Sequence, residues 1–405
     1  MSKKIYNDII IKTKDEELLE FSYDDEIGVF YEKINSNRKS KRNIILKQSF
    51  KYFYVTEDFN RNVNLICQDI TGNIILCILE DDTWKFKTLF CIKYNLITPI
   101  NIKGFFLKKD FNFLFSADND SKNIYFKDKF NTSLKKIHSE NNNIDINYNI
   151  LQGNNYISLI IHSISFEMYK LVLKSFKKDE NTWSENKIIY ITNHPYVDTS
   201  YCITNNIVHF LIAVNEEKTK SIIYKNINLD KNEKLQRETI IFENENISSC
   251  LIIKLKEVLW ALWISDDKLY GCYSMNFGED FSKPSVYKIL KEENIKKVSY
   301  IENYEKKEIY ITENNDCINL FLEEILNNEF LLEINHKEIS YNLKEKEEIN
   351  VVNKEIKKLK EIVNNQKSQI MKLEYKLYKG RDLWKYINSE IKSKVVIKGR
   401  NLNGI

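Results

Sequence analysis

Glycine and proline are both scarce in this sequence of 405 residues, with 9 and 3 copies respectively. No GxxxxGK(S/T), GxGxxG or GxSxG pattern occurs, which argues against glycine-rich loops that cradle phosphates. No uncharged apolar run approaches the about 18 residues that a membrane-spanning helix requires. The amino terminus alternates charged and apolar residues and does not resemble a signal peptide, so we expect a cytoplasmic protein.

Residues suited to metal or redox chemistry are also few. The seven cysteines are odd in number, form no CxxC pair and mostly fall in apolar segments, so we interpret them as buried free thiols. None of the five histidines has another His, Cys or carboxylate at the spacing of metal ligands. His162 and His209 lie in apolar strand patterns, which indicates hydrogen-bonded core residues. The sequence therefore predicts no catalytic residue, no cofactor and no metal ion.

What the sequence does contain is a repeat. A two-armed apolar segment with a polar turn recurs seven times at intervals of 43 to 51 residues, and further strand-like runs rich in Ile, Val, Tyr and Phe follow it. Four short strands every ~50 residues is the period of a β-propeller blade. We predict an all-β propeller of about seven four-stranded blades over residues 1–341, or six if the first or last copy is degenerate. The second arms begin near Leu18, Val63, Phe113, Tyr156, Ile207, Val258 and Ile309.

One turn of the repeat has a recognisable pattern. The stretch DENTWSENKIIY, residues 179–190, places Trp183 behind an acidic turn and before a β-branched run. It resembles a loosened Asp box of sialidase-type propellers, although the usual glycine and the Ser-x-Asp spacing are missing. Trp84 in EDDTWKFKTLF and Phe281 in GEDFSKPSVYKIL hold corresponding places in two other copies. We predict that these rings pack between neighbouring blades, while the acidic turn residues accept backbone hydrogen bonds.

The resemblance does not extend to catalysis. A sialidase-like site needs several arginines to hold the substrate carboxylate through paired hydrogen bonds. The chain has six arginines, of which two share one loop and two lie in the tail: Arg38, Arg42, Arg61, Arg237, Arg381 and Arg400. We therefore predict a protein that is not an enzyme. A glycan-active enzyme with its site in the axial pocket is the remaining alternative.

The tail changes to a heptad pattern, which predicts a coiled coil at residues 345–379. β-branched residues at a with Leu at d favour a parallel dimer, whereas Ile362 at g widens the apolar stripe as in a trimer. An amphipathic helix that packs back onto its own propeller is the alternative. Gly380 weakens the helix and precedes a basic extension, residues 380–405. The predicted oligomerisation residues are Ile349, Val352, Ile356, Leu359, Val363, Gln366, Ile370, Leu373 and Leu377.

Charge is divided between the two parts of the chain. Residues 342–405 contain 16 Lys and Arg against 8 Asp and Glu, a net charge of +8, which leaves −5 for the remainder of a chain whose net charge is +3. A basic tail can contact nucleic acid or an anionic surface. The last stretch, residues 391–405, lacks interleaved aromatic residues, which disfavours both of these partners.

The combination predicts a non-enzymatic oligomeric scaffold, in which the propeller rim binds a protein partner and the coiled coil gives a homo-oligomer. Joining several propellers would strengthen weak contacts by raising the effective concentration. The alternative is a glycan-binding, lectin-like propeller on an oligomeric stalk, of the kind found in spore-surface or phage-associated proteins. Exposed aromatic residues repeated on one face would favour the glycan alternative, and ionisable residues clustered at the axis would favour an enzyme.

Overall fold

The computed structural model describes residues 8–320, except for nine short gaps, together with Gln366 and Asn388. The gaps are 36–37, 93–96, 119–120, 129–133, 142–143, 166–167, 231–237, 291–294 and 315–316. The chain divides into two compact units, Met1–Glu324 and Ile325–Ile405. The predicted coiled coil and basic extension lie outside the described residues apart from Gln366 and Asn388, both in helical conformation. No helix in the described part is long and apolar enough to cross a membrane.

The described strands occur in seven consecutive sets along the chain. The first two are β1 (Ile9–Lys12), β2 (Leu18–Asp24), β3 (Gly28–Asn35), β4 (Arg38–Lys39) and β5 (Asn43–Leu46), then β6 (Ser49–Glu57), β7 (Val63–Asp69), β8 (Asn73–Glu80) and β9 (Thr83–Cys91). The next two are β10 (Ile102–Leu107), β11 (Asp110–Asp118), β12 (Ser121–Lys127) and β13 (Lys135–Asn141), then β14 (Asp145–Gln152), β15 (Tyr156–Ile164), β16 (Tyr169–Lys177), β17 (Thr182–Trp183) and β18 (Lys187–Thr192). The last three are β19 (Tyr196–Thr204), β20 (Ile207–Glu216), β21 (Thr219–Asn228) and β22 (Thr239–Asn244), then β23 (Ile247–Leu255), β24 (Val258–Ser265), β25 (Lys268–Ser274) and β26 (Ser285–Ile289), then β27 (Ile295–Glu302), β28 (Glu305–Asn314) and β29 (Cys317–Leu320).

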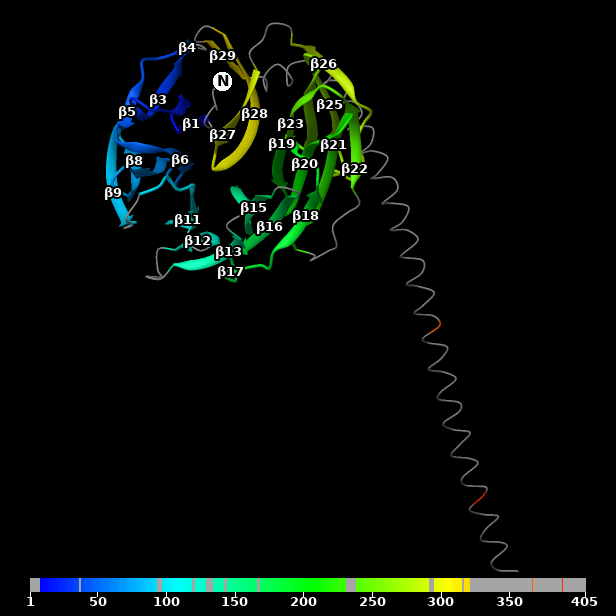
Figure 1. The fold of residues 1–405 in the computed structure, drawn as a ribbon, viewed down its shortest axis with the longest axis horizontal. Helices are drawn as coiled ribbons and strands as arrows, with labels where there is room; N and C mark the ends of the chain where they lie inside the picture. The colour runs from blue at the N-terminus through cyan, green and yellow to red at the C-terminus, as the bar shows by residue number, and fades with distance from the viewer. Residues whose placement is uncertain are drawn as a thin grey trace, which may run out of the picture. The chain divides into compact units, whose positions relative to one another are not determined.

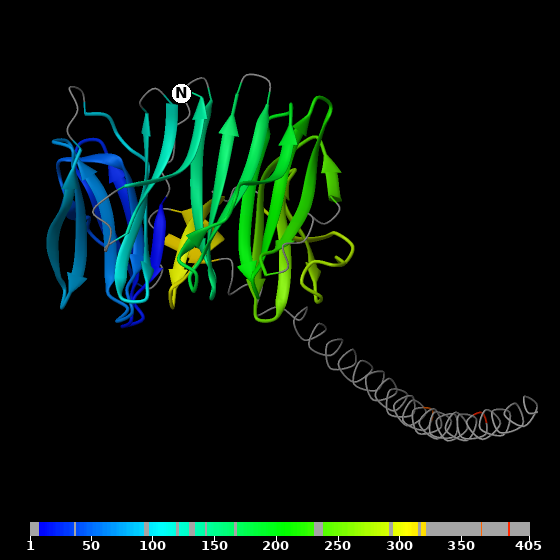
Figure 2. The same cartoon turned by 90° about the horizontal axis from the view of Figure 1, so that it is seen from below.

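These strands form a six-bladed propeller in the described part of the chain, not the seven-bladed one predicted (Figure 1). Five sets form separate antiparallel sheets around a ring, and Figure 2 shows the ring from the side. The seventh set is not a blade of its own. Strand β27 pairs in parallel with β1, with Ile9 opposite Ser299, and β29 pairs with β4, so the first and last sets merge into one eight-stranded sheet.

The β27–β28 hairpin lies inside the ring of blades (Figure 1). Strand β28 contacts the inner strands β14, β19 and β23, which belong to three successive blades. The last repeat thus retains a strand hairpin but places it along the axis, where it closes the ring between the sixth and first blades. This placement explains why seven sequence repeats give six blades.

The hydrophobic core consists of clusters between consecutive blades. Strand β20 illustrates the arrangement, because its side chains alternate between two clusters. Phe210 and Ile212 pack toward the preceding blade, whereas Leu211 and Ala213 pack toward the following one, and all four are completely buried. Burying a large apolar side chain stabilises the fold by about 1.5–3 kcal/mol. A strand buried on both faces requires a nearly continuous apolar run, as IVHFLIAV provides.

The scarcity of glycine is compatible with these tight hairpins because Asn and Asp occupy the positions that need positive φ. Asn205 and Asn206 between β19 and β20 have φ of 47° and 62°. Asp266 and Asp267 between β24 and β25 have φ of 50° and 54°. Short polar side chains tolerate this left-handed conformation better than other non-glycine residues do.

The three aromatic residues singled out in the sequence each contact the preceding blade. The ring of Trp183 lies 5.7 Å from that of Phe126 on β12 and 5.2 Å from that of Phe176 on its own blade. In the other two copies, the ring of Trp84 lies 6.2 Å from that of Phe21, and the ring of Phe281 lies 4.8 Å from that of Tyr224. All three rings are half-buried between two blades.

The turns around Trp183 and Phe281 are held by serine hydroxyls. Ser184 Oγ accepts a hydrogen bond from Ser175 N at 2.9 Å, and Ser282 Oγ accepts one from Tyr273 N at 3.1 Å. No described turn amide donates to Asp179, the acidic residue that we expected to accept such bonds. In these two copies the hydroxyl that follows the ring therefore fixes the turn to the third strand of its blade, whereas Trp84 is followed by Lys85.

Replacing Trp183 by alanine should lower the free energy of unfolding by about 3 kcal/mol, because it removes an aromatic ring from between two blades. The matched control is Trp183→Phe, which keeps a ring and should change stability much less. The indole Nε1 has no hydrogen-bond partner among the described residues, so phenylalanine loses no such bond. Chemical denaturation of the three proteins measures the difference. Equal stability of the alanine and wild-type proteins would contradict a packing role.

Candidate functional site

A cavity of about 350 Å³ lies on the axis between the β27–β28 hairpin and the inner strands β14 and β19. Its volume falls within the range of small-molecule sites, which are about 300–1,000 Å³. The lining is largely polar and comes from segments that are far apart in the sequence. The residues that matter for its chemistry are Asn147, Asn149, His162, Asp198, Ser299 and Lys306.

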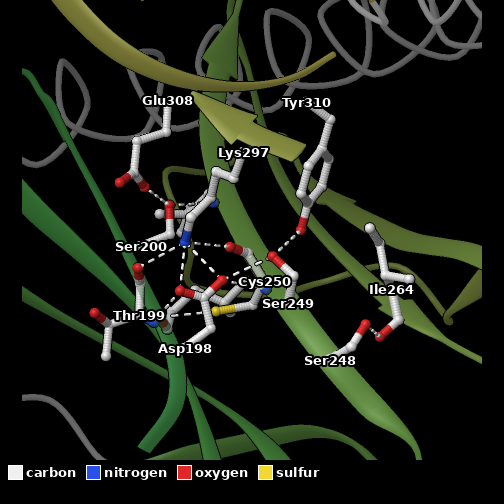
Figure 3. Close-up of polar contacts among 12 residues, drawn as sticks. Asp198, Thr199, Ser200, Ser248, Ser249, Cys250, Ile264, Lys297, Glu308 and Tyr310 are labelled. Atoms are coloured by element: carbon white, nitrogen blue, oxygen red, sulfur yellow. Dashed lines mark hydrogen bonds and ion pairs between the residues drawn. The ribbon is translucent and has the colours of Figure 1, made fainter. Parts of the chain in front are cut away.

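Lys297 of β27 ties the axial hairpin to the fifth and sixth blades (Figure 3). Its Nζ donates to both carboxylate oxygens of Asp198 at 2.6 Å, to Thr199 O at 2.9 Å and to Cys250 O at 3.1 Å. Burial opposes the charge of Lys297, but the Glu308 and Asp198 carboxylates more than offset it and raise the pKa of this amine. Lys297 is therefore a fixed cation in the wall of the cavity.

The two carboxylates that face Lys297 are themselves held by donors from the inner strands. Asp198 Oδ2 accepts from Ser249 Oγ at 2.8 Å and from Cys250 N at 2.9 Å. Ser200 Oγ donates to Glu308 Oε2 at 2.5 Å (Figure 3). Such charge-assisted bonds are the stronger class of hydrogen bonds in proteins. Neither carboxylate is free to act as an unrestrained acid or base.

The neighbouring residue, Lys296, forms a similar ion pair with a carboxylate on the opposite face of β27. Successive side chains of a strand point to opposite faces, so Lys296 faces away from Lys297. Lys296 Nζ lies 2.6 Å from Asp8 Oδ2, and Asp8 also accepts from Ser22 Oγ at 2.6 Å. The two ion pairs hold both faces of β27 between the first and fifth blades.

His162 contributes a neutral polar group to the cavity wall. Burial lowers the pKa of His162 to about 4, although the Asp198 carboxylate acts in the opposite direction. Its Nε2 lies 2.5 Å from the hydroxyl of Tyr201, whose pKa is raised chiefly by burial. A neutral imidazole beside a protonated phenol offers no base poised near neutral pH. The interpretation of His162 as a hydrogen-bonded residue agrees with this contact, although it lines the cavity rather than the interior of a blade.

His209 lies in the core as predicted. It is completely buried and forms hydrogen bonds with the hydroxyls of Thr204 and Tyr224, both at 2.7 Å.

Among the described residues, no three His, Cys, Asp or Glu side chains form a group able to hold a metal ion. Of the cysteines predicted to be buried free thiols, Cys67, Cys77, Cys250 and Cys272 are free and buried, whereas Cys202 is free and half-buried and Cys91 is free and exposed.

Sequence reasoning did not identify the residues of the cavity. Asp8, Asp198 and Lys297 meet on the axis although they are spread over nearly the whole propeller, so no local motif unites them. The available signal was a charged residue within an inner-strand pattern, as in YVDTSY and IKKVSY. Trp84, Trp183 and Phe281 do not line this cavity. The predicted oligomerisation residues lie outside the described part of the chain except Gln366.

No protein-family model and no curated protein sequence matches this chain, so the Asp-box likeness has no support from a family model. Among solved structures it is similar to the SapL1 lectin in complex with α-methyl fucoside, with 10% identity over 70% of this chain and 95% of that one and a TM-score of 0.41. It is also similar to the polysaccharide lyase Uly1, with 8% identity over 74% of this chain and 82% of that one and a TM-score of 0.45. A third similar structure is the cobalt-substituted apocarotenoid oxygenase of Synechocystis, with 9% identity over 71% of this chain and 73% of that one and a TM-score of 0.43.

These structures include a lectin and two enzymes. Identities of 8 to 10% and TM-scores below 0.5 carry no argument about what this chain does. Its function has to be argued from its own residues.

Proposed function

We propose that this protein is a non-enzymatic binding module whose axial cavity binds a hydroxyl-rich ligand of the glycan type. The observation that carries the proposal is a polar cavity whose charged carboxylates are already paired. Lys297 and Lys296 neutralise Asp198 and Asp8, and the neighbouring imidazole is neutral. Such a wall favours binding over acid–base chemistry.

Uncharged polar groups remain available in the cavity. The amide Nδ2 of Asn147 and the hydroxyl of Ser299 have no hydrogen-bond partner among the described residues. Asn149 contributes a second amide, whose Nδ2 already donates to Tyr201 OH at 3.3 Å, and Tyr196 contributes an aromatic ring to the lining. Sugar hydroxyls both donate and accept hydrogen bonds, and amide side chains can satisfy both roles. This chemistry suits a saccharide better than an apolar ligand.

The direct test is a glycan array followed by calorimetry with wild-type protein and Asn149→Leu. Leucine has a similar size but removes the amide, so affinity for a captured glycan should fall about tenfold or more. The control is Asn215→Leu, which changes an exposed asparagine on β20 outside the cavity. Failure of every glycan to bind the wild-type protein would contradict the proposal. Equal loss in both variants would place the binding elsewhere.

A protein partner, as in the scaffold hypothesis, is favoured by one surface feature. Phe59 and Tyr304 are 55% and 41% exposed, and their rings lie 6.2 Å apart. Tyr304 OH donates to Phe59 O at 2.9 Å and fixes the pair in place. Exposed, ordered aromatic residues are typical anchors of protein interfaces. This pair lies in the turns β6–β7 and β27–β28 and marks the rim position for such a partner.

Self-association through the tail remains part of the proposal. Ile356→Asp with Ile370→Asp places two charges at a positions, so an oligomer should become a folded monomer. The matched control is Asn364→Asp with Asn365→Asp, which adds the same charge at b and c positions and should leave the oligomer intact. Native mass spectrometry reads the outcome. An unchanged mass in the isoleucine variant would contradict oligomerisation through the heptads.

A further inference from the structure

Two lysines share one aromatic ring near the propeller axis. Lys103 Nζ of β10 lies 5.2 Å from the centroid of the Tyr54 ring, and Lys306 Nζ of β28 lies 4.6 Å from it. Tyr54 belongs to β6, so the contact joins two successive blades and the axial hairpin. Lys306 also lines the axial cavity described above. Lys306 therefore brings an amine to the cavity wall, whereas Lys103 and Tyr54 lie behind the lining residues.

Neither lysine has an acidic partner of its own. Lys103 is only 7% exposed, yet no described residue forms a hydrogen bond or ion pair with it. Lys306 is likewise without a hydrogen bond or ion pair in the described part of the chain. Glu308 on the same strand acts on Lys306 through its charge, but its carboxylate accepts a hydrogen bond from Ser200. Buried lysines are normally paired, because burying an uncompensated charge is costly.

The other lysines of the hairpin show how different this site is. Lys296 and Lys297 each have a carboxylate at 2.6 Å. Lys307 lies 3.6 Å from Glu302. Lys103 and Lys306 instead share the Tyr54 ring, and the charge of Lys306 acts on Lys103. An anion in the cavity would supply the missing partner of Lys306 and would also offset the charge of the nearby Lys103.

We propose that the axial cavity contains an anion site, at which Lys306 binds a phosphate, sulfate or carboxylate group of the ligand and the nearby Lys103 adds positive charge. The inference deepens the proposed function and rests on it, because Lys306 lines the same cavity. The ligand class then becomes an acidic saccharide, with its hydroxyls at Asn147, Asn149 and Ser299 and its anionic group at the lysines.

Protonation should control the site. Burial and the nearby Lys306 lower the pKa of Lys103 to about 7, and burial lowers that of Lys306 to about 8 against the opposing effect of Glu308. Tyr54, whose pKa is raised by burial, stays neutral beside them. Anion binding requires the ammonium forms, so affinity should fall as the pH rises through 7 to 8 and above. Sulfate is the suitable probe, because its charge is constant over this range.

The experiment measures the thermal shift and calorimetric affinity of full-length protein for sodium sulfate and inorganic phosphate at pH 6 and pH 9.5. Wild-type protein should bind both anions at pH 6 and bind sulfate at least roughly tenfold more weakly at pH 9.5. Lys103→Met and Lys306→Met should each reduce affinity at pH 6 by about tenfold or more. Lys256→Met, which replaces an exposed lysine outside the cavity, is the matched control and should bind as wild type does.

The melting temperature of each variant in anion-free buffer shows whether the substitution affects folding. Lys103→Met removes an uncompensated buried charge, so its melting temperature in anion-free buffer should equal or exceed that of wild type. A lower melting temperature would show that the Lys103 amine is already satisfied and would overturn the inference. Undiminished sulfate binding by both lysine variants, or no binding by wild type at pH 6, would also overturn it.

A second arm compares neutral sugars with their uronate and sulfated counterparts. Preference for the acidic member of each pair, lost in Lys306→Met, supports both the anion site and the glycan proposal. Equal binding of neutral and acidic sugars overturns the anion inference and leaves the proposed function standing. Sulfate binding that depends on both lysines, without binding of any sugar, supports the anion site and contradicts the glycan proposal.

Discussion

The ion pair between Lys297 and Asp198 is the contact on which the centre of this propeller depends. It joins the last strand hairpin of the described chain to the inner strand of the fifth blade, with further bonds from Lys297 to Thr199 and Cys250. The pair is partly buried, so removing one member should destabilise the fold by leaving the other charge uncompensated. These bonds fix the β27–β28 hairpin on the axis, where its residues form one wall of the cavity.

The same interaction explains how far the sequence could predict the fold. The repeat pattern correctly predicts the first residue of the second strand in five copies: Leu18, Val63, Tyr156, Ile207 and Val258. This prediction succeeds because the alternation of buried residues along a strand is a local property of the sequence. Blade number is not local. Whether the seventh copy forms a blade or fills the axis depends on its pairing with β1 and on contacts with β14, β19 and β23, which are distant in sequence. The cavity is missed for the same reason, since Asn149, Asp198 and Lys297 share no spacing.

Charge at the axis divides into two kinds with different consequences. Lys296 and Lys297 are neutralised by protein carboxylates and serve to position the hairpin. Lys103 and Lys306 have only the face of Tyr54, a weaker interaction than an ion pair with a carboxylate. The paired carboxylates and the unpaired amines are the observations behind the proposed recognition of an acidic ligand, and the proposed oligomeric tail would strengthen that recognition.

The most direct test of the central claim is a double-mutant cycle on the axial ion pair, with unfolding free energies measured for Asp198→Asn, Lys297→Met and the two combined. If the pair fixes the hairpin, the double variant should be more stable than the sum of the single effects implies, with a coupling energy of about 1.5 kcal/mol or more. Additivity within about 0.5 kcal/mol would contradict the account, because it would show that the two residues do not depend on each other in the folded protein.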